Sequence, residues 1–390
     1  MNFDRDIGRR GTHCMKWDRL EQVTGVSPED GLAMWVADSD FATAPCVTRA
    51  LQTRLDHGAF GYGFDDAGLR AGIGWWMDTR HGWAIEPGWI IPTQGLGHAI
   101  GMAIDTWTDI GDGVCFFTPV YHEFRLKTER AERVPFEIPM QLVDGRYELD
   151  FDAAEEVIDD TVKMLIFCSP QNPSGRVWSA AELNAVAEFC EKHDLILISD
   201  EIHADLMYGG RRHIPTDIAA PAFRHRTVTI NASSKTFNLP GFRLGYAIIP
   251  DDGLRAAYQR RMRMTEYSPA TLSVAATIAA YTPEGADWVE AQIAYLEGNR
   301  AVFDAGLNAI PGVWSMPLES TYLAWVDFSG TGMEEPEVTA RIRDVAKIGV
   351  SPGKQFGPGG ETFNRFNLAM PRFMIEDAVA RMQRAFADLQ

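Results

Sequence analysis

Short, continuous runs of apolar residues recur through the middle of this 390-residue chain, and they constrain its fold more than any other feature. Apolar runs of this kind, without polar residues at every second position, are typical of strands covered on both faces of a sheet. Amphipathic segments separate them, and one begins with a capping box formed by Ser179 and Glu182. The alternation predicts a mostly parallel sheet in an α/β domain. The predicted strands are residues 113–118, 162–168, 195–199, 227–231 and 245–249.

The pattern changes from about residue 283 onward. A helical stretch at 288–310 leads to strand-like segments at 321–328 and 363–369, and a terminal helix follows from about residue 375. This order predicts a second, smaller α+β domain. The first 45 residues precede the regular alternation, so we expect them to pack with the smaller domain. The predicted large domain is 46–285, and the predicted small domain combines 1–45 with 286–390.

Charge and composition exclude several classes of protein. The chain has 36 Lys and Arg against 54 Asp and Glu, and this net charge of −18 gives no general attraction to nucleic acid or anionic lipid. The first residues lack the apolar core of a signal peptide, and no apolar run reaches the length of a membrane span. The five cysteines have no CxxC spacing, which predicts reduced core thiols in a cytoplasmic protein and no metal site.

Residues 93–97 (TQGLG) precede a further helical pattern. The glycines leave a helix N-terminus bare, with free N–H groups and the positive end of the helix dipole. This arrangement suits an anion, although an ordinary glycine-rich turn is the alternative.

The segment from Asn231 to Tyr246 carries the clearest chemical signal. A predicted strand ends there, small hydroxyl residues follow, and Lys235 comes eight residues before Arg243. A nucleophilic amine that forms a Schiff base needs an enclosed setting of this kind. The arginine fork suits a phosphate group. The alternative for this segment alone is an ordinary polar loop.

Polar residues also follow three other predicted strands. Tyr121 comes after the strand at 113–118, Asn172 lies between two prolines after 162–168, and Asp200 follows the apolar strand at 195–199. A buried carboxylate needs a cationic partner. Because open α/β sheets bind ligands at the carboxyl ends of their strands, we expect these three residues and Lys235 to gather at one edge of the sheet.

The order Tyr…NPxG…DE…SK…R resembles that of the fold-type I pyridoxal-phosphate enzymes of the class I/II aminotransferase superfamily. More narrowly, the chain resembles the MalY/PatB group of cystathionine β-lyases, or C–S lyases. The resemblance implies the aspartate aminotransferase fold, with a mostly parallel seven-stranded sheet and a smaller α+β domain. It runs from end to end and rests on RRGTHCMKWD (9–18), MWVADSDF (34–41), FGYG (60–63), NPSGRVW (172–178), SDEIHADL (199–206), SKTFNLPG (234–241), TYLAW (321–325) and SPGKQFG…RFNLAMPR (351–372).

The resemblance also implies the roles of the residues around the cofactor, pyridoxal 5′-phosphate. Lys235 would bind it covalently and act in catalysis with Tyr121, which would stack on the ring. Asp200 would pair with the ring nitrogen and Asn172 with the phenolate oxygen. His203 is a mark of the lyase group, and an equal alternative is that it only supports its neighbours.

The remaining roles concern the phosphate and the substrate. The resemblance implies that Arg365 binds the α-carboxylate of an amino-acid substrate as a bidentate fork. The expected phosphate ligands are Gly95, Leu96, Ser233, Ser234 and Arg243, together with Tyr62 from the neighbouring subunit of a homodimer. Other expected substrate contacts are Trp35, Asp38 and Tyr322. The alternative for the aromatic residues Trp35 and Tyr322 is that they pack in the core.

Three features depart from the lyase pattern. Ala232 stands three residues before the lysine, where the superfamily often has a phosphate-binding serine. PGFRLGY at 240–246 resembles general aminotransferases, and Asp38-Ser39-Asp40 differs from the ADMDF usual in the lyase group. The leading hypothesis is a carbon–sulfur β-lyase that releases pyruvate and ammonia. The alternatives are an aminotransferase and a cofactor-binding regulatory protein with residual activity.

Overall fold

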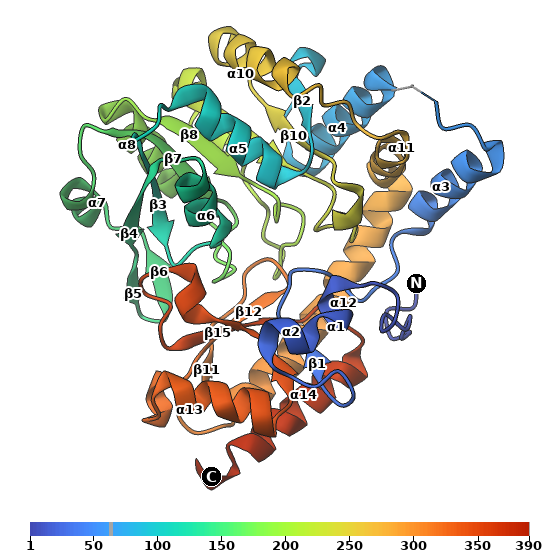
Figure 1. The fold of residues 1–390 in the computed structure, drawn as a ribbon, viewed down its shortest axis with the longest axis vertical. Helices are drawn as coiled ribbons and strands as arrows, with labels where there is room; N and C mark the ends of the chain where they lie inside the picture. Colours follow the sequence, from blue (N-terminus) through green and yellow to red (C-terminus); the bar gives the residue numbers. More distant parts are fainter. Residues whose placement is uncertain (62–64, 390) are drawn as a thin grey trace.

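A seven-stranded sheet forms the centre of the computed structural model, which describes residues 1–61 and 65–389 (Figure 1). Its strand order is β2-β10-β9-β8-β7-β3-β4. The four pairs from β9 to β4 are parallel, whereas β10 is antiparallel to both neighbours. The predicted mostly parallel sheet is thus confirmed, with β10 as the exception. The strands are β2 (Ile90–Thr93), β3 (Gly113–Thr118), β4 (Val134–Pro139), β7 (Val162–Cys168), β8 (Ile196–Asp200), β9 (Thr227–Asn231) and β10 (Gly245–Ile248).

Helices cover both faces of this sheet, which explains the continuous apolar runs. In β3, Val114 and Phe116 face a cluster with α5 (Leu96–Trp107), α6 (Glu123–Arg130) and α10 (Asp252–Met264). Cys115 and Phe117 face the opposite cluster, with α7 (Phe151–Val157) and α8 (Ala180–Lys192). Every residue of the strand is therefore buried, and no polar position interrupts the run. The capping box predicted at Ser179 begins α8.

Further helices flank the sheet and lead to the second part of the molecule. They are α3 (Pro45–His57), α4 (Asp66–His81), α9 (Thr216–Ala219), α11 (Thr271–Ala280) and α12 (Pro283–Asn308), and a hairpin is formed by β5 (Gln141–Val143) and β6 (Arg146–Glu148). The long helix α12 runs from beside the large sheet to the smaller sheet (Figure 1). No helix of the described residues is long and apolar enough to span a membrane.

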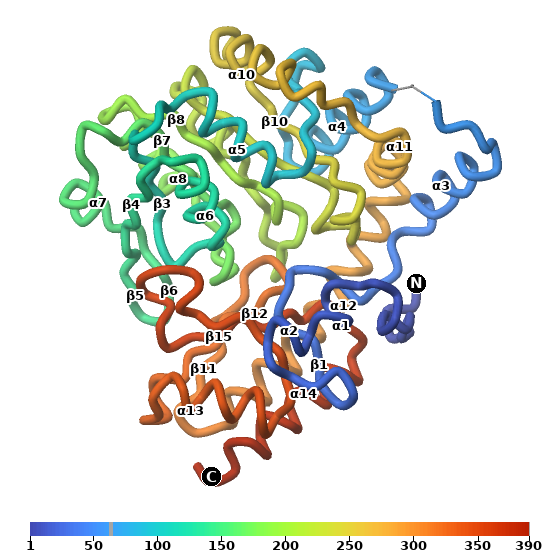
Figure 2. The backbone as a smooth tube through the Cα atoms, in the orientation of Figure 1, coloured from blue at the N-terminus to red at the C-terminus, as the bar shows by residue number. Residues whose placement is uncertain are grey.

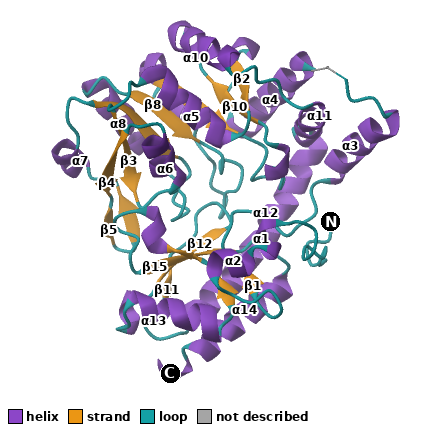
Figure 3. Ribbon diagram, in the orientation of Figure 1, coloured by secondary structure: helices purple, strands orange, loops and turns teal. Residues whose placement is uncertain are grey.

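The smaller sheet has four antiparallel strands in the order β11-β12-β15-β14 (Figure 3). The N-terminal segment lies along this part of the molecule, where β1 pairs in parallel with β13 (Figure 2). The predicted domain limits stay a prediction, and the limit at 285/286 falls inside α12. The elements are α1 (Met15–Asp18), α2 (Leu20–Thr24), β1 (Leu32–Ala33), β11 (Trp314–Ser315), β12 (Leu323–Asp327), α13 (Glu335–Ala340), β13 (Ile348–Gly349), β14 (Ser351–Pro352), β15 (Phe363–Asn367) and α14 (Arg372–Ala385).

Candidate active site

The strand register brings the predicted site residues to one edge of the large sheet. The parallel strands β7 and β8 end side by side, at Cys168 and Asp200. Farther along the same edge, Gly245 at the start of antiparallel β10 pairs with Thr93 at the end of β2. The loops that leave this edge carry Gly95, Tyr121, Asn172, His203, Lys235 and Arg243.

Lys235 and Asp200 are two ionisable groups whose pKa values move toward neutrality. Burial lowers the pKa of the Lys235 amine to about 8, against the opposing effect of the Asp38 carboxylate. The amine donates a hydrogen bond of 2.7 Å to the Ala37 carbonyl. Burial raises the pKa of Asp200, which is only 4% exposed, to about 7. Its carboxylate accepts a bond of 3.2 Å from the Ile202 amide, and no cation of the described chain forms an ion pair with it.

Two further side chains at this edge are held in their neutral forms. Burial lowers the pKa of His203 to about 3, and the nearby positive charges of Lys235 and Arg365 add to the effect. Its Nδ1 is buried without a hydrogen-bond partner among the described residues. Burial also raises the pKa of Tyr121 to about 12. Near pH 7 the imidazole is therefore uncharged and the phenol is protonated.

Arg365 connects the smaller sheet to the loop after β7. The side chain is 4% exposed, and its Nη1 donates to Asn172 Oδ1 at 2.8 Å while Nη2 donates to the Trp35 carbonyl at 3.0 Å. Its Nε is buried without a partner among the described residues, and its guanidinium lies 4.8 Å from the centre of the Phe356 ring. Burial lowers its pKa to about 10, so it stays charged near pH 7. A buried cation with neutral acceptors and a free N–H suits a carboxylate.

The predicted phosphate ligands surround the start of α5. Gly95 precedes the helix with a φ of 74°, and no side chain of residues 1–61 or 65–389 caps the free amides. Arg243 is exposed and its guanidinium makes no hydrogen bond to a described residue. It lines a pocket of about 640 Å³ together with Gln94 and His98 of the α5 start. The Ser233 hydroxyl is paired with Thr277 at 3.3 Å, whereas the Ser234 hydroxyl has no partner in the described chain.

The predicted substrate contacts differ in their surroundings. Trp35 and Tyr322 are buried, and the Trp35 indole donates to the Lys16 carbonyl at 2.9 Å. The Asp38 carboxylate accepts two bonds, of 2.8 and 2.9 Å, from Arg9. Tyr62 lies outside the described residues.

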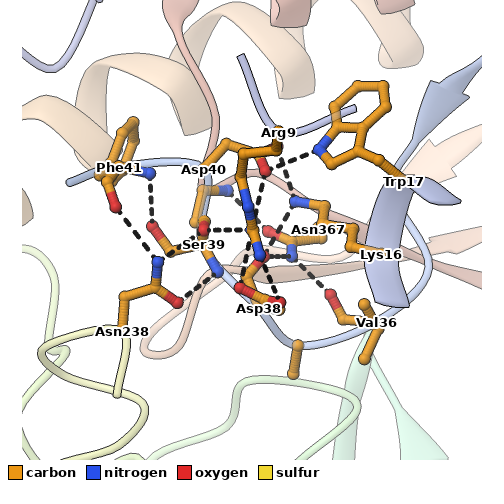
Figure 4. Close-up of polar contacts among 12 residues, drawn as sticks. Arg9, Lys16, Trp17, Val36, Asp38, Ser39, Asp40, Phe41, Asn238 and Asn367 are labelled. Carbon is orange, nitrogen blue, oxygen red and sulfur yellow. Dashed lines mark hydrogen bonds and ion pairs between the residues drawn. The ribbon is translucent and has the colours of Figure 1, made fainter. Parts of the chain in front are cut away.

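The segment 35–39 is held by a set of side chains of which only Lys235 and Arg365 received a role in the sequence analysis; Figure 4 shows part of this set. Five successive carbonyls accept hydrogen bonds from side chains that come from four other regions of the chain. Their positions lie within motifs quoted above, but the motifs alone do not reveal which group each binds. The donors are Arg365 and Ser351 to Trp35 O, Asn367 to Val36 O, Lys235 to Ala37 O, Lys16 and Asn367 to Asp38 O, and Arg9 and Asn238 to Ser39 O.

These features fit pyridoxal phosphate. An amine of lowered pKa suits the aldehyde of that cofactor, and a buried carboxylate without a cation suits its ring N–H. Arg243, without a protein partner in the described chain, and the bare start of α5 suit its phosphate. The fold and the site together define an α/β protein built to hold this group at the carboxyl ends of its strands.

The chain belongs to the aminotransferase class I and II family, whose model matches residues 33–382. It is 36% identical to cystathionine beta-lyase PatB of Bacillus subtilis, over 99% of this chain and 100% of that protein. It is 33% identical to protein MalY of Escherichia coli, over 98% of each chain. Among solved structures it is similar to cystalysin from Treponema denticola, which contains pyridoxal 5′-phosphate, with a TM-score of 0.94, 32% identity and coverage of 100% and 99% of the two chains.

Proposed function

We propose that this protein is a pyridoxal-phosphate-dependent carbon–sulfur β-lyase. Its substrate is cystathionine or another S-substituted cysteine, and its products are a thiol, pyruvate and ammonia. The full-length similarity to cystathionine beta-lyases supports the reaction. The observation that carries the proposal is the convergence of Lys235, whose pKa burial lowers to about 8, with the buried carboxylate of Asp200 and the buried guanidinium of Arg365.

Each residue of the cofactor site has a proposed task. When bound, pyridoxal phosphate supplies an electron sink for a carbanion at the substrate Cα. Lys235 binds its aldehyde carbon, Asp200 accepts a hydrogen bond from its ring nitrogen, and Asn172 donates to its phenolate oxygen. Tyr121 and His203 pack against the ring. The phosphate is held by Arg243, by Ser234 and by the amides of Gly95 and Leu96, and Ser233 is a further candidate.

The chain's own groups also orient the substrate and move its proton. Arg365 binds the α-carboxylate, since its Nε is unpaired among the described residues and its two Nη groups bond to neutral acceptors. The Lys235 amine takes the proton from Cα, and a pKa of about 8 keeps a useful fraction of it neutral near pH 7. The bond between Cβ and sulfur then breaks, the thiolate leaves, and water is consumed as pyruvate and ammonia form. Trp35, Asp38 and Tyr322 are the proposed remaining substrate contacts.

The decisive experiment supplies cystathionine to the cofactor-loaded protein without any keto acid. We expect repeated turnovers in which thiol, pyruvate and ammonia appear in equal amounts. Lys235→Ala should remove both the turnover and the cofactor adduct that borohydride fixes to the chain. Turnover that begins only after a keto acid is added would instead indicate an aminotransferase, and fixation at another lysine would contradict the site.

We also propose that the protein is a cytoplasmic homodimer in which Tyr62 reaches the phosphate of the partner subunit. The nearby Phe60 is 57% exposed, as expected of a segment that a second subunit covers. The five cysteines are free and buried, in keeping with a reducing compartment. Sedimentation at the mass of two chains is the expected result.

A further inference from the structure

A buried cluster of charged side chains borders the segment 36–40 (Figure 4). Lys16 is 0% exposed, and its Nζ lies 2.8 Å from Asp40 Oδ2. The other oxygen of Asp40 accepts bonds of 2.9 Å from the Trp17 indole and 3.0 Å from Arg9. A buried ion pair contributes little net stability, because desolvation offsets the attraction, but its hydrogen bonds fix the geometry of its neighbours. The role of this cluster therefore depends on which neighbouring groups its hydrogen bonds hold in place.

The same cations bind the backbone on the carboxyl side of Ala37. Lys16 Nζ donates to the Asp38 carbonyl at 2.9 Å, and Arg9 donates to the Ser39 carbonyl at 2.7 Å. The carbonyls on both sides of Ala37 are thus held by groups other than Lys235, since Asn367 binds the Val36 carbonyl. The Lys235 amine donates to the Ala37 carbonyl that lies between them, at 2.7 Å.

We propose that Lys16 and Asp40 are positioning residues for Lys235. Their ion pair, assisted by Arg9, fixes the segment 36–40 so that the Ala37 carbonyl holds the amine in one orientation whenever the amine is free. An amine that donates one N–H to a fixed acceptor keeps its lone pair in a narrow range of directions, which favours proton transfer from a bound substrate. This last consequence rests on the proposed lyase function, whereas the positioning itself does not.

The test measures Lys235 in the full chain after removal of the cofactor, with reloading as the check on the fold. Trace acetylation at several pH values, read by mass spectrometry at Lys235, gives the pH midpoint of its reactivity. In Lys16→Met we expect the segment to relax, so that the ammonium form loses the Ala37 carbonyl and its closeness to the Asp38 carboxylate. The midpoint should then fall by about half a pH unit or more. The other groups that act electrostatically on Lys235, which are Asp200, Arg365 and His203, are unchanged in this variant.

Two further variants make the result decisive. Lys16→Met with Asp40→Asn replaces the buried pair by neutral groups, so it guards against misfolding from an unpaired buried charge, and it should shift the midpoint in the same direction. Arg10→Gln is the matched control, because Arg10 lies in the same N-terminal stretch as Lys16 but its guanidinium binds the Gly31 carbonyl at 2.7 Å and, among the described residues, meets the cluster only through the face of the Trp17 ring. In the loaded enzyme, the Lys16 variants should lose about tenfold in kcat with KM within about twofold.

Either of two outcomes overturns the proposal: a midpoint that stays at the wild-type value in both Lys16 variants, or an equal shift in Arg10→Gln. A fall in thermal stability alone, with the wild-type midpoint, would assign the cluster a purely structural role. Because acetylation needs neither cofactor nor substrate, its result stands even if the protein releases no pyruvate. Conversely, an active lyase with unshifted midpoints would keep the proposed function and reject the positioning role.

Discussion

Asp200 is a carboxyl group whose charge depends on the presence of a cation beside it. In the cofactor-free chain, burial raises its pKa to about 7. In an unfolded chain its pKa returns to about 3.9. Between these values the folded protein binds a proton that the unfolded protein does not, so the free energy of unfolding falls as the pH rises from about 4 to about 7.

We therefore predict that Asp200→Asn removes this pH dependence. An asparagine amide cannot ionise, so the cofactor-free wild type should lose a few kcal/mol relative to the variant between about pH 4 and pH 7. Urea unfolding of both proteins at pH 5, 6, 7 and 8 measures the difference, in which the other titrating groups cancel. Loading with pyridoxal phosphate, whose ring N–H compensates the carboxylate, should reduce the loss. If the free energies of unfolding of the two cofactor-free proteins change with pH in parallel, Asp200 does not have a raised pKa in the folded protein.

At the residue scale, the sequence predicts which groups reach the edge of the sheet but not how they are supported. Asp200 could be placed because a strand carries it, and Arg365 because a family resemblance covers its motif. The bond between Lys235 and the Ala37 carbonyl joins residues 198 positions apart, and that between Arg365 and Trp35 spans 330. No local pattern encodes such a contact, so the carbonyls of 35–39 and their donors emerged only from the three-dimensional arrangement.

At the element scale, apolar runs identified five buried strands but not their directions. The run at 245–249 looks like the others, yet β10 is antiparallel because it returns along β9 after the loop that carries Lys235. The strands β2 and β4, at the two edges of the sheet, were not predicted. β4 contains Pro135 and Pro139 and begins with Val134, which is 46% exposed, and β2 contains Pro92. Prolines are tolerated at such an edge but obscure the strand pattern.

The contact between β10 and the start of α5 gives a prediction at this scale. A Cβ at Gly245 would lie 3.1 Å from Gly95 Cα and 3.0 Å from the Leu96 side chain. Gly245→Ala should therefore push the free amides of α5 away from the phosphate and weaken pyridoxal-phosphate binding about tenfold, or about 1.4 kcal/mol. Spectroscopic titration of the cofactor measures the change in Kd.

Gly101→Ala provides the matched control, since Gly101 lies in the same helix and a Cβ there meets no atom within 4 Å. This variant should keep the wild-type Kd and gain about 0.5–1 kcal/mol in stability. Equal affinity of the Gly245 and Gly101 variants would show that the start of α5 does not hold the phosphate.

At the scale of the whole molecule, a chain of net charge −18 must attract an anionic cofactor through local cations. The Arg243 guanidinium is exposed at the pocket beside α5, whereas Lys235 and Arg365 lie deeper. At long range, the acidic surface therefore repels the anionic cofactor, and the local cations of the site attract it only at close range.

Screening this field should accelerate the association of pyridoxal phosphate with the cofactor-free protein. We expect the rate constant to rise about two- to threefold between 20 and 200 mM NaCl. Stopped-flow absorbance measures it, and pyridoxal, which lacks the phosphate, should show almost no salt effect. A rate that falls with salt would mean that local cations also dominate the long-range field.

The fold class was predictable because it follows from the strand–helix alternation through the middle of the chain and from the change of pattern after about residue 283. The packing of the first residues beside the C-terminal strands is also visible, since β1 pairs with β13 and Met34 accepts a bond from the Asn367 amide. The sequence could suggest this only by exclusion, because residues 1–45 carry no alternating pattern of their own.

The contacts between the segment 35–39 and the C-terminal strands have a consequence for the synthesis of the protein on the ribosome. Residues 35–39 emerge early, but their partners Ser351, Arg365 and Asn367 belong to the last tenth or so of the chain. The large sheet, complete by Ile248, can form while this early segment still lacks its acceptor surface. The segment whose Ala37 carbonyl binds Lys235 therefore gains its last supporting contacts only at the end of translation, so a truncated chain can build the sheet before the support of the lysine is complete.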